Sequence, residues 1–281
     1  MSKSLCIYHG NCADGFGAAW VVHNATNGSA ELYPGVYGAP PPDVTGRRVF
    51  IVDFSYPRDV IIDMAAKAES ITIIDHHKTA QEQLIDLPKN VTVVFDMEKS
   101  GAILAWIYFF PLIPPPMLLL HIQDRDLWRF ELDGTREIQA ALFSYPYEIE
   151  TWTNLIRQEP ELLRQDGEAI ERKHHKDIKE LLSATMREMV IGGHVVWCAN
   201  LPYTMASDAC HQMCLMPIID GSGAWSPPAF SACYYDAKDR RVFSLRSVED
   251  FDVSAIAKLY GGGGHKNAAG FSRPIGWEGE R

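Results

Sequence analysis

The chain has 281 residues, of which 47% are hydrophobic and 22% are charged. These fractions are typical of globular proteins and exclude a disordered chain, a fibre or a coiled coil. The formal net charge of −10 disfavours non-specific binding to long duplex DNA, because such binding depends on many contacts from Lys and Arg to phosphates. A short anionic substrate remains compatible with this charge.

The sequence predicts neither a membrane span nor an export signal. The longest apolar stretch, residues 102–120, is interrupted by four prolines, and the first residues reach polar side chains too soon for a signal peptide. Six cysteines are few for this length, so we expect reduced thiols rather than disulfides. These features favour a cytoplasmic location.

Short β-branched runs alternate with helical patterns along the first part of the chain. The strand-like runs are 5–8, 49–52, 71–74 and 91–95, and the helical patterns are 15–23, 58–68, 100–110 and a run from 117 towards 123. This alternation predicts an α/β fold with a largely parallel sheet flanked by helices. In such a sheet, ligands bind beyond the carboxyl ends of the strands, so the polar residues that follow each strand should converge.

The remaining part predicts a connecting helix and a smaller domain. Residues 159–191 are charged and helix-friendly, with a weak point at Gly167, and Gly192-Gly193 follows as a boundary. Beyond it lie strand-like runs at 194–198, 230–235 and 242–245 and helical patterns at 206–215 and 253–260. We therefore expect a first domain over 1–158, a connecting helix over 159–191 and a C-terminal α/β domain over 192–281.

Side chains that can bind metal follow each predicted strand of the first domain. Carboxylates and imidazoles in this mixture suit manganese, magnesium or zinc. Two cations about 3.5–4 Å apart could hold a phosphate, generate a hydroxide nucleophile and neutralise the leaving oxygen, and Asp53 is our choice for the carboxylate that bridges them. The candidates are His9, Asp14, Asp53, Asp75, His76, His77 and either Asp124 or Asp126.

A single aspartate at the end of a strand is more often a helix cap or a turn residue than a ligand. The run Asp75-His76-His77 directly after a strand is harder to explain by solvation alone. The complete set therefore favours a metal site over a series of separate caps.

Four glycines before His265 predict a phosphate-binding loop, because consecutive backbone N–H groups without side-chain bulk can point into one concavity. A glycine run alone is more often a flexible connection. Here a helix pattern and the apolar run 268–271 flank it, which favours a rigid loop. The substrate-binding candidates are Arg246, Gly262, Gly263, Gly264 and His265.

These motifs resemble those of the DHH family phosphoesterases, the superfamily of the nano-RNases and RecJ-like proteins. The run His9–Gly15 resembles the first motif, Val52-Asp53 the second, Asp75-His76-His77 the third and Asp126–Phe130 the fourth. Residues 242–270 resemble the DHH-associated substrate-binding domain, so the resemblance covers nearly the whole chain.

The resemblance implies a phosphoesterase that is usually manganese-dependent, with the metals in residues 1–158 and substrate-binding groups in 192–281. It implies that Asp75, His76 and His77 act in catalysis on a short single-stranded oligonucleotide or a small nucleotide. The expected activity is a nano-RNase-like 3′–5′ exonuclease or nucleotide phosphatase. The alternatives are a cyclic-dinucleotide phosphodiesterase, a processive exonuclease on long single strands, which the acidic charge disfavours, and a non-catalytic nucleotide-binding protein. The cleavage polarity and the oligomeric state, including a homodimer, stay open.

Two positions complicate the match to the family motifs. Cys12 stands where the first motif normally has an aspartate, and a thiolate is a poor match for manganese. One of the two expected Mn²⁺ ions could therefore be weakly held, and Mg²⁺ is an alternative. In the fourth motif the family pattern aligns better with Asp126, whereas Asp124 could support it from behind or replace it.

Overall fold

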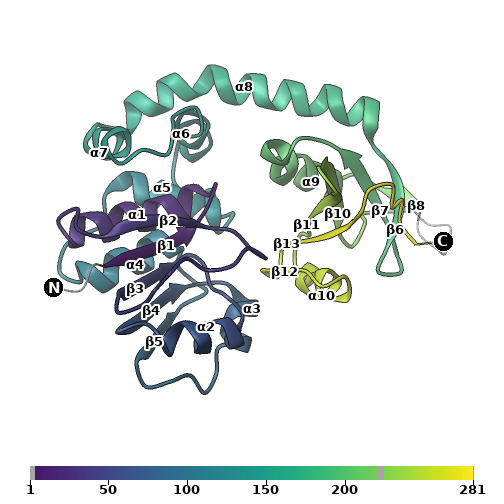
Figure 1. Cartoon of the computed structure of the whole chain (residues 1–281). Helices are drawn as coiled ribbons and strands as arrows, with labels where there is room; N and C mark the ends of the chain where they lie inside the picture. Colours follow the sequence, from purple (N-terminus) through teal and green to yellow (C-terminus); the bar gives the residue numbers. More distant parts are fainter. Residues whose placement is uncertain (1–3, 220–224, 281) are drawn as a thin grey trace. The chain divides into compact units, whose positions relative to one another are not determined.

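The computed structural model describes residues 4–219 and 225–280 (Figure 1). The chain divides into two compact units, Met1–Glu171 and Arg172–Arg281, with the division inside helix α8 (Pro160–Thr185). Within the described ranges, we find no helix with both the length and the apolar character that crossing a membrane requires. All six cysteines are free thiols, as expected.

The first unit is built on a parallel sheet. Its strands in the described residues are β1 (Leu5–His9), β2 (Glu31–Gly35), β3 (Arg48–Val52), β4 (Ser70–Asp75) and β5 (Val91–Phe95), in the order β2-β1-β3-β4-β5. Every neighbouring pair in this order is parallel. The carboxyl ends of the strands therefore share one edge, and the predicted α/β fold with a parallel sheet is confirmed.

Helices cover both faces of this sheet. Leu5 and Ile51 belong to a core with Ile61 of helix α2 (Arg58–Ala65), whereas Cys6 and Val52 belong to a core with helices α1 (Ala13–Ala25), α4 (Gly101–Phe109) and α5 (Met117–Asp126). Strands that are buried on both faces need apolar side chains at nearly every position, which is why they read as continuous apolar runs. The helices are α1 (Ala13–Ala25), α2 (Arg58–Ala65), α3 (Lys78–Gln83), α4 (Gly101–Phe109), α5 (Met117–Asp126), α6 (Thr135–Leu142) and α7 (Ile149–Arg157).

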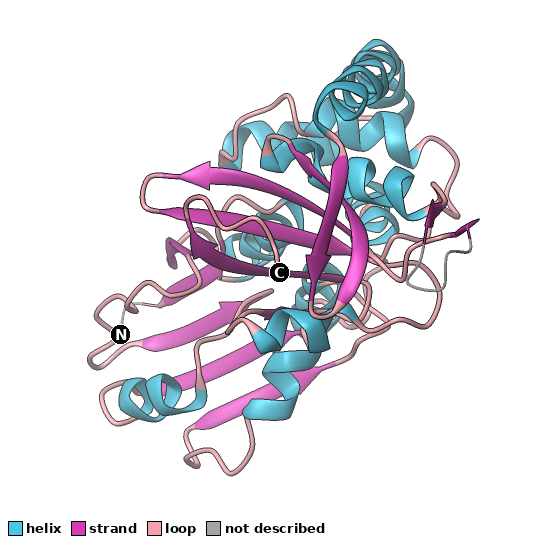
Figure 2. Cartoon of the chain, turned by 90° about the vertical axis from the view of Figure 1, so that its right-hand side faces the viewer, coloured by secondary structure: helices cyan, strands magenta, loops and turns pink. Residues whose placement is uncertain are grey.

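The second unit is a smaller α/β structure on a mixed sheet. Figure 2 distinguishes its strands, in magenta, from its helices, in cyan. The sheet order is β12-β13-β11-β10-β7-β6, and the β7–β10 pair is parallel while the other pairs are antiparallel. The elements are β6 (Arg187–Ile191), β7 (His194–Asn200), η1 (Tyr203–Met205), α9 (Ala206–Cys214), β8 (Ile218–Ile219), β9 (Trp225–Ser226), β10 (Ser231–Ala237), β11 (Arg240–Arg246), α10 (Val253–Leu259), β12 (Gly263–Gly264) and β13 (Ala268–Pro274).

The connecting segment differs from its prediction in two ways. Residues 187–191 form strand β6 rather than the end of a helix, because Gly192 and Gly193 both adopt positive φ (58° and 77°) and turn the chain back into β7. Gly167 does not weaken α8, which runs through it. A Cβ atom at Gly167 would lie 1.8 Å from the carbonyl oxygen of Glu137, so the glycine permits close packing of α8 on α6.

Candidate metal centre

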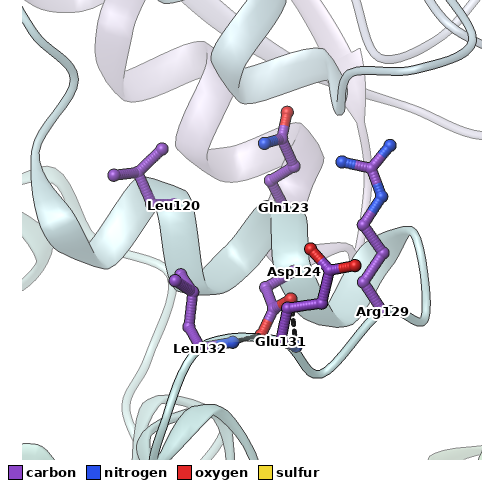
Figure 3. A pocket seen from close by; sticks show the side chains of 6 residues that line it. All are labelled: Leu120, Gln123, Asp124, Arg129, Glu131 and Leu132. Carbon is purple, nitrogen blue, oxygen red and sulfur yellow. Dashed lines mark hydrogen bonds between the residues drawn. The ribbon is translucent and has the colours of Figure 1, made fainter.

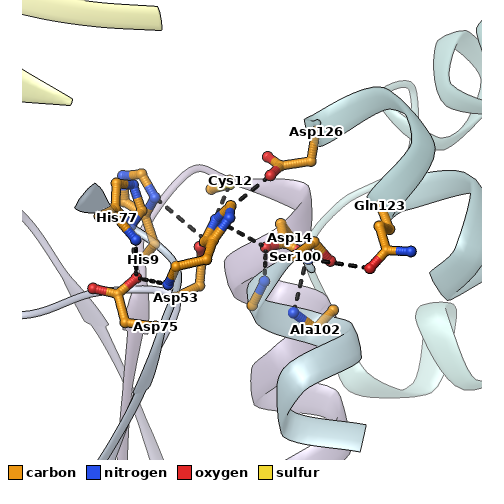
Figure 4. Close-up of polar contacts among 12 residues, drawn as sticks. His9, Cys12, Asp14, Asp53, Asp75, His77, Ser100, Ala102, Gln123 and Asp126 are labelled. Carbon is orange, nitrogen blue, oxygen red and sulfur yellow. Dashed lines mark hydrogen bonds and ion pairs between the residues drawn. The ribbon is translucent and has the colours of Figure 1, made fainter. Parts of the chain in front are cut away.

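Three neighbouring strands bring polar side chains to the carboxyl edge of the parallel sheet (Figure 4). His9 is the last residue of β1, Asp53 directly follows β3, and Asp75 is the last residue of β4. These strands are adjacent in the sheet order, so positions 9, 53 and 75 are placed together by topology alone. The convergence expected from the strand pattern is present in the structure.

Helix ends and the loop after β4 complete the cluster. The Nε2 atom of His76 lies 3.1 Å from Asp53 Oδ1, 3.5 Å from Asp126 Oδ2 and 3.8 Å from Asp14 Oδ2. Asp14 comes from the first turn of α1, and Asp126 is the last residue of α5. His76 is therefore surrounded by three carboxylates from three different elements.

Asp53 is shared by two groups of potential metal ligands. The ligand atoms of Asp14, Asp53 and His76 all lie within 4.8 Å of one another, and so do those of His9, Asp53 and His77. Asp53 Oδ1 is the oxygen 3.1 Å from His76, whereas Oδ2 lies 3.4 Å from Nδ1 of His9. Each oxygen of this carboxylate thus faces a different group, which is the arrangement that a bridging carboxylate requires.

The backbone at Asp53 is held in an uncommon conformation. Its φ is 52°, in the left-handed region that a non-glycine residue rarely adopts, at a cost of about 1–3 kcal/mol. Its N–H donates to the carbonyl of Ile74 on β4 at 2.9 Å, which fixes the turn. A Cβ atom at Gly101 would lie 2.5 Å from the Cβ atom of Asp53, so the glycine makes room for this side chain.

The carboxylate of Asp14, which belongs to α1, lies at the N-terminus of helix α4. The carboxylate accepts hydrogen bonds from the backbone N–H groups of Gly101 (2.5 Å) and Ala102 (3.0 Å). A helix N-terminus favours negative charge. Burial and the carboxylates of Asp53 and Asp126 nevertheless raise the pKa of Asp14 well above its usual value. The negative charge of Asp14 is therefore incompletely compensated by the protein.

The shifts in pKa across the cluster come mainly from burial and from the cluster itself. Burial lowers the pKa of His76, but the hydrogen bond to Asp53 and the surrounding carboxylates outweigh it and raise this pKa to about 10. Burial raises the pKa of Asp53, but His76 and His9 outweigh it and hold this pKa well below its usual range. Because Asp14 and Asp53 are at most 2% exposed, their charges gain little from water, and divalent cations would satisfy them.

Asp75 orients His77. The Nδ1 atom of His77 lies 2.6 Å from Asp75 Oδ1, which also accepts the backbone N–H of His76 at 2.8 Å. A carboxylate bound to one ring nitrogen fixes the tautomer and the orientation of the ring, so that the other nitrogen can bind a cation. Neither of the two ligand groups formed around Asp53 by the described residues includes Asp75. Its second oxygen, Oδ2, is buried and has no hydrogen-bond partner among the described residues.

Asp124 holds the loop that follows α5. Its oxygens accept hydrogen bonds from Glu131 N (2.8 Å), Leu132 N (3.1 Å) and Thr135 Oγ1 (2.6 Å). It lines a small pocket of about 150 Å³ together with Leu120, Gln123, Arg129, Glu131 and Leu132. Figure 3 shows these side chains. Because the acceptors of Asp124 are already used, we retain Asp126 rather than Asp124 in the proposed ligand set.

Cys12 lies beside the cluster and not at its centre. It precedes α1, and its Sγ donates to Asp53 Oδ2 at 3.5 Å. Burial, followed by the charges of Asp53, Asp126 and Asp14, raises the pKa of Cys12 well above its usual value. The side chain is therefore a neutral thiol at neutral pH in the metal-free protein, and a neutral thiol is a poor ligand for a hard cation.

The glycine run of the second unit is packed more tightly than expected. The N–H of Gly262 donates to Ala257 O at 2.9 Å and that of His265 to Ala268 O at 2.8 Å. A Cβ atom at Gly262 would lie 2.0 Å from the carbonyl oxygen of Gly270. The glycine at this position is thus required for close packing against β13, and these two N–H groups are not open donors for a phosphate.

Arg246 ends strand β11 and is held by neighbours within the second unit. Its Nη2 donates to Ser207 Oγ at 2.7 Å and its Nη1 to its neighbour's carbonyl, Leu245 O, at 2.8 Å. Gly263 and Gly264 pair with Gly270 and Ala269 as strand β12. The substrate-binding roles of Arg246, Gly263, Gly264 and His265 stay predictions.

The sequence did not point to Tyr37, which lies beside the cluster. Its ring centre is 5.4 Å from that of His9, 6.2 Å from that of His77 and 4.7 Å from that of Phe54. It follows β2, a strand that the sequence pattern did not predict. The available signal was an aromatic residue in a glycine-flanked loop, Gly35-Val-Tyr-Gly38.

No protein-family model matches the chain. An uncharacterized protein of Acanthamoeba polyphaga mimivirus is 28% identical over 289 aligned residues, which cover 95% of this chain and 67% of that protein.

Three solved structures are similar, each at 14% sequence identity. For the pGpG-specific phosphodiesterase PggH from Vibrio cholerae the TM-score is 0.47, and the alignment covers 97% of this chain and 94% of the PggH chain. An exopolyphosphatase-related protein from Bacteroides fragilis has a TM-score of 0.48, with 98% and 88% covered. RecJ from Thermus thermophilus in complex with Mn²⁺ has a TM-score of 0.49, with 96% and 49% covered.

Proposed function

We propose that the chain is a divalent-metal-dependent phosphoesterase of the DHH type, which hydrolyses short single-stranded oligonucleotides or small nucleotides. The observation that carries this proposal is the position of Asp53, whose two oxygens face two separate groups of carboxylate and imidazole ligands. Ligands of this chemistry suit Mn²⁺ and Mg²⁺. The motif resemblance of the sequence supports the same reaction.

The described residues divide into roles that fit this reaction. Asp14, Asp53, His76 and Asp126 would hold one cation, and His9, Asp53 and His77 the other. Bound divalent cations would activate water and neutralise the charge that develops on the phosphate during an in-line displacement. His76 must lose its proton to become a ligand, because its pKa is raised to about 10 in the metal-free protein.

Asp75 would act through His77 rather than on the phosphate. The short contact between Asp75 Oδ1 and His77 Nδ1 fixes the ring, and Nε2 would then be the nitrogen left to bind a cation. The resemblance of residues 242–270 to a substrate-binding domain supports substrate-binding roles for Arg246 and His265. The overall negative charge favours a substrate with few phosphates over a long polyanion.

A panel of substrates tests the proposal. Turnover of 5′-phosphorylated diadenylate, cyclic diadenylate and adenosine 3′,5′-bisphosphate would be measured with Mn²⁺, with Mg²⁺ and with EDTA. We expect metal-dependent hydrolysis of at least one of them and a loss of about 10³-fold or more in kcat for Asp53→Asn, since both cations lose a ligand. Asp63→Asn, an exposed aspartate on α2, is the matched control. Hydrolysis that persists in EDTA or in Asp53→Asn would contradict the proposal.

A non-catalytic nucleotide-binding protein is the second candidate, and the specific observation in its favour is Cys12. A neutral thiol 3.5 Å from Asp53 stands where an additional carboxylate would strengthen a cation site. Tight binding of diadenylate without turnover by the wild-type protein, together with turnover by Cys12→Asp, would favour this second function.

A further inference from the structure

The ring of Tyr37 has two distinct environments. It packs against Phe54, which is fully buried, at a centroid distance of 4.7 Å and an interplanar angle of 43°. The rings of His9 and His77 meet it edge to face, at interplanar angles of 70°. Even so, 51% of Tyr37 is exposed. The side chain is therefore supported by aromatic neighbours and about half exposed, whereas burial, Asp75 and Asp53 raise the pKa of its hydroxyl well above the usual value.

The positions of these neighbours relate the exposed ring to the candidate metal centre. His9 and His77 form one of the two ligand groups around Asp53, and both rings adjoin Tyr37. The loop that carries Tyr37 is tied to the first motif, because the N–H of Gly10 donates to Gly35 O at 2.9 Å. A nucleotide with its phosphate beside these histidines would thus bring its base or sugar to Tyr37.

We propose that the exposed surface of the Tyr37 ring is the platform on which a base of the substrate stacks, next to the phosphate. This inference rests on the proposed function and adds a substrate contact within the first unit. Large apolar rings with few rotatable bonds lose little entropy on binding, and support from Phe54 holds this ring in place before the substrate arrives. Because every base has a π-face, this contact would secure the substrate without selecting among bases.

Binding measurements separate stacking from other roles of Tyr37. The Kd of 5′-phosphorylated diadenylate would be measured by calorimetry with Ca²⁺, alongside the Kd of the same backbone without bases. We expect Tyr37→Leu to raise the Kd of the dinucleotide roughly 5- to 150-fold, the range that loss of one base–aromatic stack produces. The Kd of the base-free compound should stay unchanged. Tyr37→Phe should bind like the wild type, because it keeps the ring.

Tyr108→Leu is the matched control. Tyr108 is 43% exposed and lies near the end of α4 that is opposite to Gly101, so its loss should change neither Kd. Three results would overturn the inference. Tyr37→Leu could weaken the binding of both compounds equally, Tyr37→Phe could weaken the binding of the dinucleotide as much as Tyr37→Leu does, or the wild-type protein could fail to bind the dinucleotide.

Turnover with Mn²⁺ is measured separately. If the wild-type protein hydrolyses the dinucleotide and Tyr37→Leu binds it normally, the proposed function stands and this inference fails. If the wild-type protein binds the dinucleotide without hydrolysing it and Tyr37→Leu binds it more weakly, the inference stands and the proposed hydrolysis fails.

Discussion

Cys12 is the residue at which the chain departs from the motif it otherwise resembles, and its surroundings predict the effect of restoring an aspartate. In Cys12→Asp a carboxylate would replace a neutral thiol that lies 3.5 Å from Asp53. We expect Mn²⁺ to bind about 10- to 100-fold more tightly, since a hard anionic ligand is added to the site. Cys12→Ser, which stays neutral, should bind Mn²⁺ as the wild type does. Calorimetric titration measures all three, and equal affinities for Asp and Ser would show that position 12 does not contact a cation.

His76 makes metal binding dependent on pH. Its pKa, raised to about 10 by Asp53 and the neighbouring carboxylates despite burial, leaves the imidazole protonated in the metal-free protein at neutral pH. A cation can bind Nε2 only after this proton leaves, so binding should release protons and the affinity for Mn²⁺ should rise as the pH increases from 6 towards about 9. Titrations in two buffers of different ionisation enthalpy count the protons. Binding without proton release would contradict this protonation state.

The raised pKa of His76 also makes the stability of the metal-free fold depend on pH. A histidine whose pKa is higher in the folded protein than in the unfolded chain stabilises the fold fully below the unfolded value of about 6.5, and this contribution is lost as the pH rises through about 10. The stability of the metal-free fold therefore falls with rising pH, whereas the affinity for Mn²⁺ rises. Alkaline pH weakens the metal-free fold through His76 while it favours the metal-bound protein.

Most residues of the candidate centre could be predicted from the sequence, because the order of the polar residues along the chain maps directly onto one edge of a parallel sheet. His9, Asp53 and His76 follow strand patterns that need no knowledge of tertiary structure. The choice between Asp124 and Asp126 could not be made, since it depends on which carboxylate bonds to the N–H groups of the loop after α5. The role of Asp75 behind His77 likewise depends on a single side-chain contact.

At the scale of elements, the packing of α8 on α6 gives a test in which two effects oppose each other. Ala is favoured over Gly inside a helix by about 1 kcal/mol. The added Cβ atom of Gly167→Ala would lie 1.8 Å from Glu137 O, which forces the helices apart. We expect overpacking to prevail and the free energy of unfolding to fall by about 1–3 kcal/mol in urea titrations. Glu168→Ala, one exposed position further along, should be nearly neutral. A more stable Gly167→Ala would show that α8 does not pack closely on α6.

Four strands of the parallel sheet could be predicted more readily than β2, β6 and β13. The strands β1, β3, β4 and β5 read as apolar runs, but β2 lies at the edge of the sheet and contains Pro34, which is permitted there and obscures the pattern. Strand β13 is rich in small residues, because a Cβ atom at Gly270 would lie 2.8 Å from the carbonyl oxygen of Phe243 on the neighbouring strand. Strand β6 was hidden by the charged helical pattern before it. These elements depend on neighbours that a local pattern does not contain.

For the whole molecule, metal binding should be visible as stability. Asp14, Asp53 and Asp75 are buried together, and cations that bind only the folded protein stabilise it by about 2.7 kcal/mol at a concentration one hundred times the Kd. We therefore expect Mn²⁺ to raise the Tm of the transition that involves the first unit, and EDTA to reverse the change. The same Mn²⁺ concentration should leave the Tm of Asp53→Asn nearly unchanged. An equal rise in both proteins, measured by calorimetry, would place the cations elsewhere.

The position of bound manganese in crystals of the wild-type protein tests the account most directly. Anomalous scattering at the manganese edge should give two peaks about 3.5–4 Å apart, one on each side of the Asp53 carboxylate. One peak should adjoin Asp14 and His76, and the other His9 and His77. Crystals grown with saturating Mn²⁺ that give no peak within bonding distance of Asp53, or peaks only at surface carboxylates, would contradict it.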